Sequence, residues 1–100
     1  MSAEAHAILL TSTPASNEVV SGQAVSAKLT FNVRVDGRRS RISWMGLDGH
    51  EHQVSIENQT SPDTLTTKFS GLTPGYYVIR WQVLAEDGHI TRGEVPFHAK

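Results

Sequence analysis

Asp87 and His89 are the pair whose residue types and spacing most readily suggest chemistry, because they stand two positions apart. In an extended segment, positions i and i+2 point to the same side, so a carboxylate and an imidazole there could hold one metal ion together. Two ligands do not make a site. Asp87-Gly88 also predicts an ordinary type I′ hairpin turn with a solvated His89, and spacing alone favours that simpler interpretation.

A further imidazole lies near the N-terminus. Ser2 to Ala5 include an Ala-x-Ala pattern of the kind that signal peptidase cleaves after, and His6 follows it, although such a pattern also arises by chance. We expect residues 1–5 to be a signal-peptide remnant or a cloned start, and to be disordered. A chain beginning at His6 would offer its α-amine and ring nitrogen to one ion. A set of one amine, two imidazoles and one carboxylate would suit Cu(II) if the geometry of the site is tetragonal. Zn(II) is the nearest competitor if the geometry is tetrahedral.

Composition narrows the class of protein. The chain has 100 residues, of which 38% are hydrophobic and 19% charged, which is enough for one domain with one small core. A formal net charge of −1 provides no basic field for nucleic acid. Cysteine is absent, which excludes disulfides and thiolate sites. There is no apolar run near the roughly 20 residues of a membrane helix, so the protein is not expected to be membrane-embedded.

The elements that must position these residues are strands. Alternation with a period of two recurs between turn residues such as Asp36-Gly37 and Asp48-Gly49, and helical periodicity is missing. Seven strands are predicted at 7–11, 24–33, 41–47, 52–57, 65–69 and 76–85, with a last strand that carries Val95 and Phe97. Seven short strands without a helix predict an all-β, antiparallel sandwich.

One aromatic feature favours the immunoglobulin-like form of the sandwich. Tyr77 opens the longest strand in phase with its core face, as in a tyrosine corner, whereas Tyr76 points the other way. The aromatic residues assigned to core faces are Phe31, Trp44, Phe69, Tyr77, Trp81 and Phe97.

The other polar clusters give no function. No Gly-x-Ser-x-Gly elbow occurs, so a hydrolase is not predicted. The arginines of residues 38–41 are interpreted as a solvated loop. His50 and His52 could form a weak imidazole site, but solvated loop histidines are the simpler interpretation.

Three motifs, in order and at fitting spacing, resemble the periplasmic copper-binding proteins of the CopC type, including the shorter YobA-like members. They are HAIL at 6–9 leading to STPA at 12–15, LTPGYY at 72–77 running to Trp81, and DGH at 87–89 followed by Thr91 and Gly93. The resemblance covers nearly everything from His6 to Lys100. It departs from the members that have a methionine-rich Cu(I) loop, since residues 44–52 hold only Met45.

The resemblance implies a Greek-key β-barrel or sandwich over residues 6–100 and one Cu(II) bound by His6, Asp87 and His89. It also implies an exported, soluble periplasmic protein that is no enzyme. Such a protein would serve copper resistance or homeostasis, or hand copper to an inner-membrane partner of the CopD type. One alternative is an immunoglobulin-like interaction module that binds no metal. A less favoured alternative is an oxidative enzyme, because copper monooxygenases use a similar ligand set. The copper hypothesis requires His6 and the 85–89 hairpin to lie at the same end of the sandwich.

Overall fold

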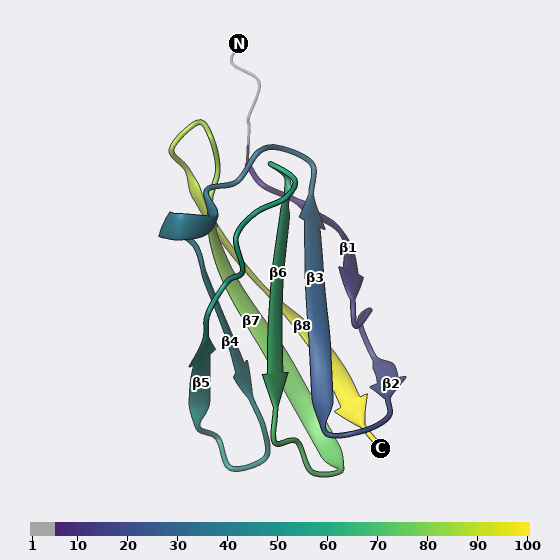
Figure 1. Ribbon diagram of the computed structural model, residues 1–100. Helices are drawn as coiled ribbons and strands as arrows, with labels where there is room; N and C mark the ends of the chain where they lie inside the picture. Colours follow the sequence, from purple (N-terminus) through teal and green to yellow (C-terminus); the bar gives the residue numbers. More distant parts are fainter. Residues whose placement is uncertain (1–5) are drawn as a thin grey trace.

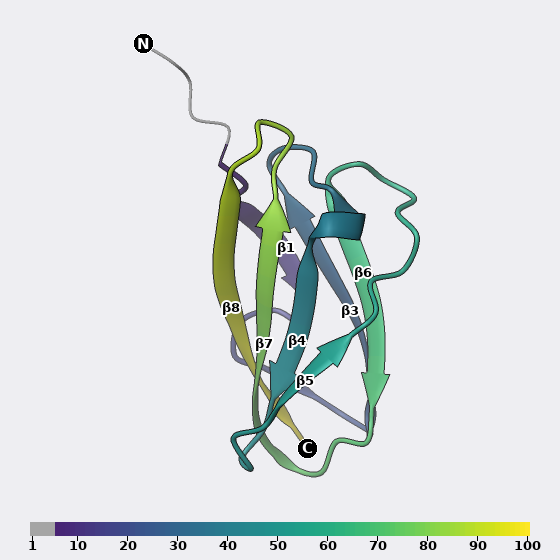
Figure 2. The same cartoon turned by 90° about the vertical axis from the view of Figure 1, so that its left-hand side faces the viewer.

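Eight strands build two sheets in the computed structural model, which describes residues 6–100 (Figure 1). The elements are β1 (Leu9–Thr13), β2 (Glu18–Val20), β3 (Ala24–Phe31), the 3-10 turn η1 (Gly37–Arg39), β4 (Arg41–Met45), β5 (Glu51–Val54), β6 (Thr64–Ser70), β7 (Gly75–Leu84) and β8 (Ile90–Ala99). One sheet has the order β1-β3-β6 and the other β2-β8-β7-β4-β5 (Figure 2). The expectation for residues 1–5 lies outside the described residues.

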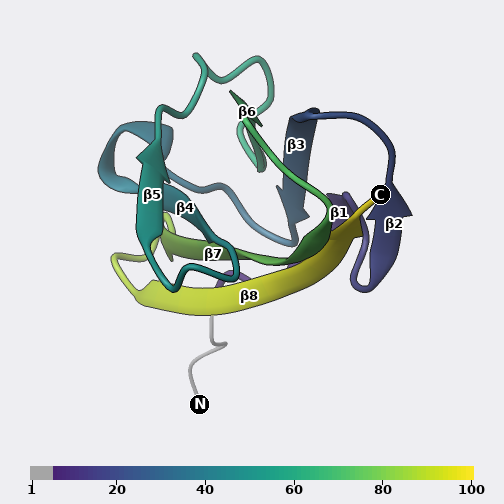
Figure 3. The ribbon, with the colours of Figure 1, turned by 90° about the horizontal axis from the view of Figure 1, so that it is seen from below.

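Strand alternation produces the core. Tyr77, Ile79, Trp81 and Val83 of β7 are all buried, whereas Arg80 between them is exposed. β3 contributes the facing layer with its own alternate positions, from Val25 to Phe31. Seen from below, the five-stranded sheet curves along one side, with β3 and β6 on the other (Figure 3). The two apolar faces therefore meet between the sheets, as expected for a sandwich.

The predicted all-β, immunoglobulin-like sandwich is confirmed, with one strand more than the seven expected. The additional strand is β2, which pairs with β8 in parallel, so the sandwich is not wholly antiparallel. Its three residues are too short to display an alternation. Its position is fixed instead by contacts distant in sequence, such as the bond that the Lys100 amide donates to the Val20 carbonyl at 2.8 Å.

The predicted tyrosine corner is confirmed. The Tyr77 hydroxyl donates to the Thr73 carbonyl at 2.8 Å and accepts from the Thr73 amide at 2.9 Å. Tyr76 points outward, as expected. Among the predicted core aromatics, only Trp44 is incompletely buried; its indole stacks on His52 and on Phe69.

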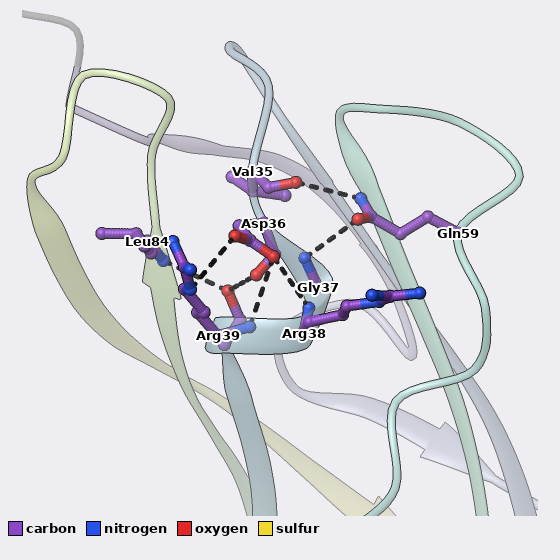
Figure 4. Close-up of polar contacts among 8 residues, drawn as sticks. Val35, Asp36, Gly37, Arg38, Arg39, Gln59 and Leu84 are labelled. Atoms are coloured by element: carbon purple, nitrogen blue, oxygen red, sulfur yellow. Dashed lines mark hydrogen bonds and ion pairs between the residues drawn. The ribbon is translucent and has the colours of Figure 1, made fainter.

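The turn η1 is held by polar side chains of this end of the molecule (Figure 4). Asp36 Oδ1 accepts from the amides of Arg38 and Arg39 at 3.0 and 3.3 Å. Gln59 accepts from the Gly37 amide at 2.9 Å and donates to the Val35 carbonyl at 3.1 Å. Arg38 and Arg39 are both exposed, and Arg39 Nε lies 3.9 Å from Asp36 Oδ2, which agrees with a solvated loop.

Candidate metal site

The η1 turn braces the base of the hairpin that joins β7 to β8. The Asp36 amide donates to the Leu84 carbonyl at 2.9 Å, and the Leu84 amide donates to Ser40 Oγ at 3.1 Å (Figure 4). Just beyond, Val35 and Ala85 form an isolated antiparallel bridge. Both backbone groups of Leu84, the last residue of β7, are therefore hydrogen-bonded, and this fixes the base of the hairpin.

The tip of this hairpin is a three-residue loop, so the type I′ turn weighed from the sequence is wrong. Ala85 and His89 close the loop, with the Ala85 amide donating to the His89 carbonyl at 2.9 Å. A type I′ turn needs positive φ at two central residues. Within residues 6–100 the only non-glycine with positive φ is Asn17, so Gly88, at φ 90°, supplies the left-handed position alone. This is the pattern of a type I turn followed by a glycine bulge, the next commonest hairpin connection.

Asp87 and His89 do lie on the same side of this loop. Asp87 Oδ1 accepts from the His89 amide at 3.0 Å, and Asp87 Oδ2 lies 2.7 Å from His89 Nδ1. The hydrogen bond from the His89 ring, assisted by the His89 amide, lowers the pKa of the Asp87 carboxyl below its ordinary value of 3.8. Asp87 is thus a carboxylate at neutral pH that fixes the ring of His89.

His6 reaches the hairpin from the other sheet. Ala7 is buried, and Asn32 forms hydrogen bonds with both backbone groups of Ile8. The Asn32 side-chain oxygen accepts from the Ile8 backbone amide at 2.7 Å, and the Asn32 backbone amide donates to the Ile8 carbonyl at 3.0 Å. The ring centroids of His6 and His89 are 4.7 Å apart, with the rings tilted by 44°. The expectation that His6 and the hairpin share one end of the sandwich is therefore confirmed.

The donor types at this end fit a nitrogen- and oxygen-seeking ion. Nδ1 of His89 and Oδ2 of Asp87, 2.7 Å apart, place an imidazole nitrogen and a carboxylate oxygen side by side, where both could bind one ion. Across residues 6–100 no three histidine, cysteine, aspartate or glutamate side chains are already gathered as a metal site. The structure brings the two imidazoles together, and the role of His6, Asp87 and His89 as metal ligands stays a prediction.

Sequence reasoning missed the residues that position the site. Asn32 and Ser40 do not stand out in the sequence, because a single asparagine or serine near a strand end carries no periodic signal. Their roles follow only from which segments the sandwich brings side by side. His50 and His52 lie at the opposite end, beside the β4–β5 connection (Figure 1).

Comparison with known proteins decides the family. The CopC domain matches residues 9–100 of the sequence. The chain belongs to the CopC family. Proteins of this family bind copper, serve copper resistance and are not enzymes. None of the curated protein sequences matches the chain. Residues 6–100 contain no helix with the length and hydrophobicity that a membrane crossing requires.

Solved structures agree with the CopC assignment. CopC from Methylosinus trichosporium OB3b is 29% identical, with a TM-score of 0.84 over 95% of this chain and 94% of that one. PcoC from Escherichia coli, described as a methionine-rich copper resistance protein, is 22% identical, with a TM-score of 0.74 over 96% and 100% of the two chains. The fibronectin(III)-like modules of Clostridium thermocellum CbhA share the fold at a TM-score of 0.56 and 18% identity, over 88% and 43% of the two chains.

Proposed function

We propose that residues 6–100 form one copper-binding domain, which holds a single Cu(II) through His6, Asp87 and His89. The observation that carries the proposal is the 4.7 Å separation of the His6 and His89 ring centroids. These rings come from segments more than 80 positions apart in the sequence, and neither is needed for the core. Imidazole nitrogen and carboxylate oxygen are ligands that Cu(II) accepts readily, and Cu(II) heads the divalent affinity order.

Each of the three residues has a separate task in this proposal. His89 supplies a ring nitrogen at the hairpin tip, where Asp87 Oδ2 lies 2.7 Å from Nδ1 of the same ring. Asp87 keeps its negative charge at neutral pH, since its pKa is lowered, and it offsets part of the positive charge of the ion. His6 supplies the second imidazole from an arm that Asn32 holds in place.

The α-amine of His6 would strengthen the site further. In the full chain that nitrogen belongs to the peptide bond with Ala5 and cannot act as an amine ligand. A chain that begins at His6 frees it, and amine and ring together form a chelate. The shorter chain should therefore bind Cu(II) more tightly than the full chain.

The biological setting proposed for this site is the periplasm. There the domain would serve copper resistance or homeostasis by holding the ion, or would pass it to an inner-membrane partner of the CopD type. Support comes from the family's role in copper resistance and from the exposed position of His89 at a hairpin tip, where a partner can reach the ion.

A Cu(II) titration followed by EPR tests the proposal. The proteins to compare are the chain starting at His6, the full chain and His89→Ala, with His98→Ala as a matched control, because His98 is an exposed histidine at the other end of β8. We expect one-to-one tight binding with nitrogen hyperfine coupling for the first, weaker binding for the full chain and a large loss for His89→Ala, while His98→Ala binds as the full chain does. Equal Cu(II) affinity in all four would reject the site, and no binding by any of them would favour the metal-free interaction module instead.

A further inference from the structure

The tripeptide Asp-Gly-His occurs twice in this chain, at 48–50 and at 87–89. Both copies form the tip of a connection between paired strands, one between β4 and β5 and the other between β7 and β8. In each, the glycine has positive φ, 75° at Gly49 and 90° at Gly88. In each, the aspartate Oδ1 accepts from the histidine amide at 3.0 Å. The β4–β5 turn thus reproduces the backbone arrangement of the candidate copper hairpin at the opposite end of the sandwich.

A second imidazole, that of His52, also lies near the β4–β5 turn. Asp48 Oδ2 lies 3.7 Å from Nδ1 of His50 and 3.9 Å from Nε2 of His52. Two donors bound to one zinc ion in tetrahedral geometry lie about 3.3 Å apart, given metal–ligand bonds of about 2.0–2.1 Å. Each of the two nitrogens is therefore about half an ångström farther from the carboxylate oxygen than two ligands of one zinc ion would be. Small side-chain rotations would close that gap, because all three side chains are well exposed.

Contact with Trp44 holds the ring of His52 in place beside Asp48. The His52 ring stacks on the indole of Trp44, with centroids 4.2 Å apart and planes inclined by 17°. Glu51, its neighbour, faces the other side of the sheet, where it accepts from Ser43 Oγ at 2.5 Å and lies 3.8 Å from a guanidinium nitrogen of Arg80. Strand alternation thus directs His52 toward Asp48 and keeps Glu51 out of the cluster.

We propose that Asp48, His50 and His52 form a second metal site, for a borderline divalent ion such as Cu(II) or Zn(II). Two imidazole nitrogens and one carboxylate oxygen are hard to borderline donors, which suit these ions and not Cu(I), the ion that thioethers prefer. The site has three protein ligands and is open to solvent, so it binds more weakly than a closed structural site. Its existence does not depend on the ligands proposed at the other end.

Tryptophan fluorescence provides the test, since Trp44 contacts His52 directly and Cu(II) quenches a nearby indole. The parent protein for the titration is the full chain with His89→Ala, which weakens the site at the far end. We expect this parent to keep one Cu(II) equivalent with quenching of Trp44. Adding His50→Ala and His52→Ala should lower that affinity at least about tenfold. Titration with Zn(II), followed by NMR of the histidine rings, should shift the resonances of His50 and His52 first.

The matched control is His98→Ala in the same parent. His98 is exposed like the other two histidines and meets Tyr76 in a T-shaped contact, with centroids 5.2 Å apart and planes inclined by 61°. No aspartate or glutamate among residues 6–100 forms an ion pair with its ring. This variant should quench as the parent does. Two results would overturn the second site: loss of all quenching in the parent, or equal quenching with and without His50 and His52. Circular dichroism should be unchanged throughout, because all of the substituted side chains are exposed.

Discussion

The two Asp-Gly-His turns of this protein share a backbone arrangement and differ in what meets them. At 87–89 the aspartate Oδ2 lies 2.7 Å from the histidine Nδ1, whereas at 48–50 the same two atoms are 3.7 Å apart. The second imidazole at 87–89 is His6, from the start of the chain, and at 48–50 it is His52, which lies two positions after His50, in β5. The tripeptide alone therefore orients one carboxylate beside one imidazole, and the surrounding fold decides which further donor completes the set.

The largest effect is expected when one histidine is removed from each turn, which tests whether the two turns act as separate metal sites. His89→Ala should lower the affinity of the tighter Cu(II) site by more than about 100-fold, since loss of a ligand exceeds the 10- to 100-fold effect of an outer-shell residue. His50→Ala should leave that affinity unchanged. Competition titration with a Cu(II) chelator of known affinity measures both. Similar losses in the two variants would mean that the turns do not act as separate sites.

Neutralising the aspartates is the next largest change. Asp87→Asn should lower Cu(II) affinity about 10- to 100-fold, less than the loss of a whole ligand, because the amide lacks the negative charge but keeps an oxygen donor and still accepts from the His89 amide. Asp48→Asn should act only on the weaker site, visible as reduced quenching of Trp44 in the His89→Ala parent. If Asp87→Asn binds as the unmodified chain does, Asp87 merely shapes the turn.

Glycine substitution compares the turns without any metal. Gly49 and Gly88 both have positive φ, and a Cβ added to either would meet no atom within 4 Å, so backbone strain is the main penalty. Gly49→Ala and Gly88→Ala should each reduce the free energy of unfolding by about 1–2 kcal/mol. Urea unfolding measures both values. A difference larger than that range would show that the two backbones are not equivalent.

The smallest expected effect is the titration of Asp87. Because its hydrogen bonds to His89 lower the pKa, the carboxyl should titrate below 3.8 in the folded chain. The stability that these bonds contribute is complete above that ordinary value and is lost as the pH falls through the lowered pKa. Carbon-13 NMR of the aspartate carboxyls measures the midpoint, which His89→Ala should return toward 3.8. An unchanged midpoint in that variant would contradict the assigned cause.

The strand pattern predicted most of the fold, because alternation reports which side of each strand is buried. It failed where a strand is too short to alternate, as in β2, and it did not predict that Trp44, near the end of β4, is only partly buried. The turn at 85–89 was assigned one residue too short, because Asp-Gly is compatible with both a two-residue turn and a three-residue loop with glycine last.

The candidate site was only partly accessible from the sequence. The spacing of Asp87 and His89 predicted their common side, which the 2.7 Å contact bears out. No spacing rule brings His6 to them, since more than 80 residues intervene; that expectation came from the resemblance to the CopC family. Asn32, which holds the His6 arm, gave no signal, because its partner groups are backbone atoms of a segment with no periodic relation to it.

The grip of Asn32 on Ile8 also bears on how an ion would leave. Pairing between β1 and β3 begins only at Leu9, and residues 7–8 before it are held by two hydrogen bonds to Asn32 and by the small buried side chain of Ala7. Breaking two such bonds takes about 1–3 kcal/mol, far less than global unfolding. We therefore expect the arm to detach while every strand stays paired, so that the frequency of this opening would set how long an ion held by His6 stays bound.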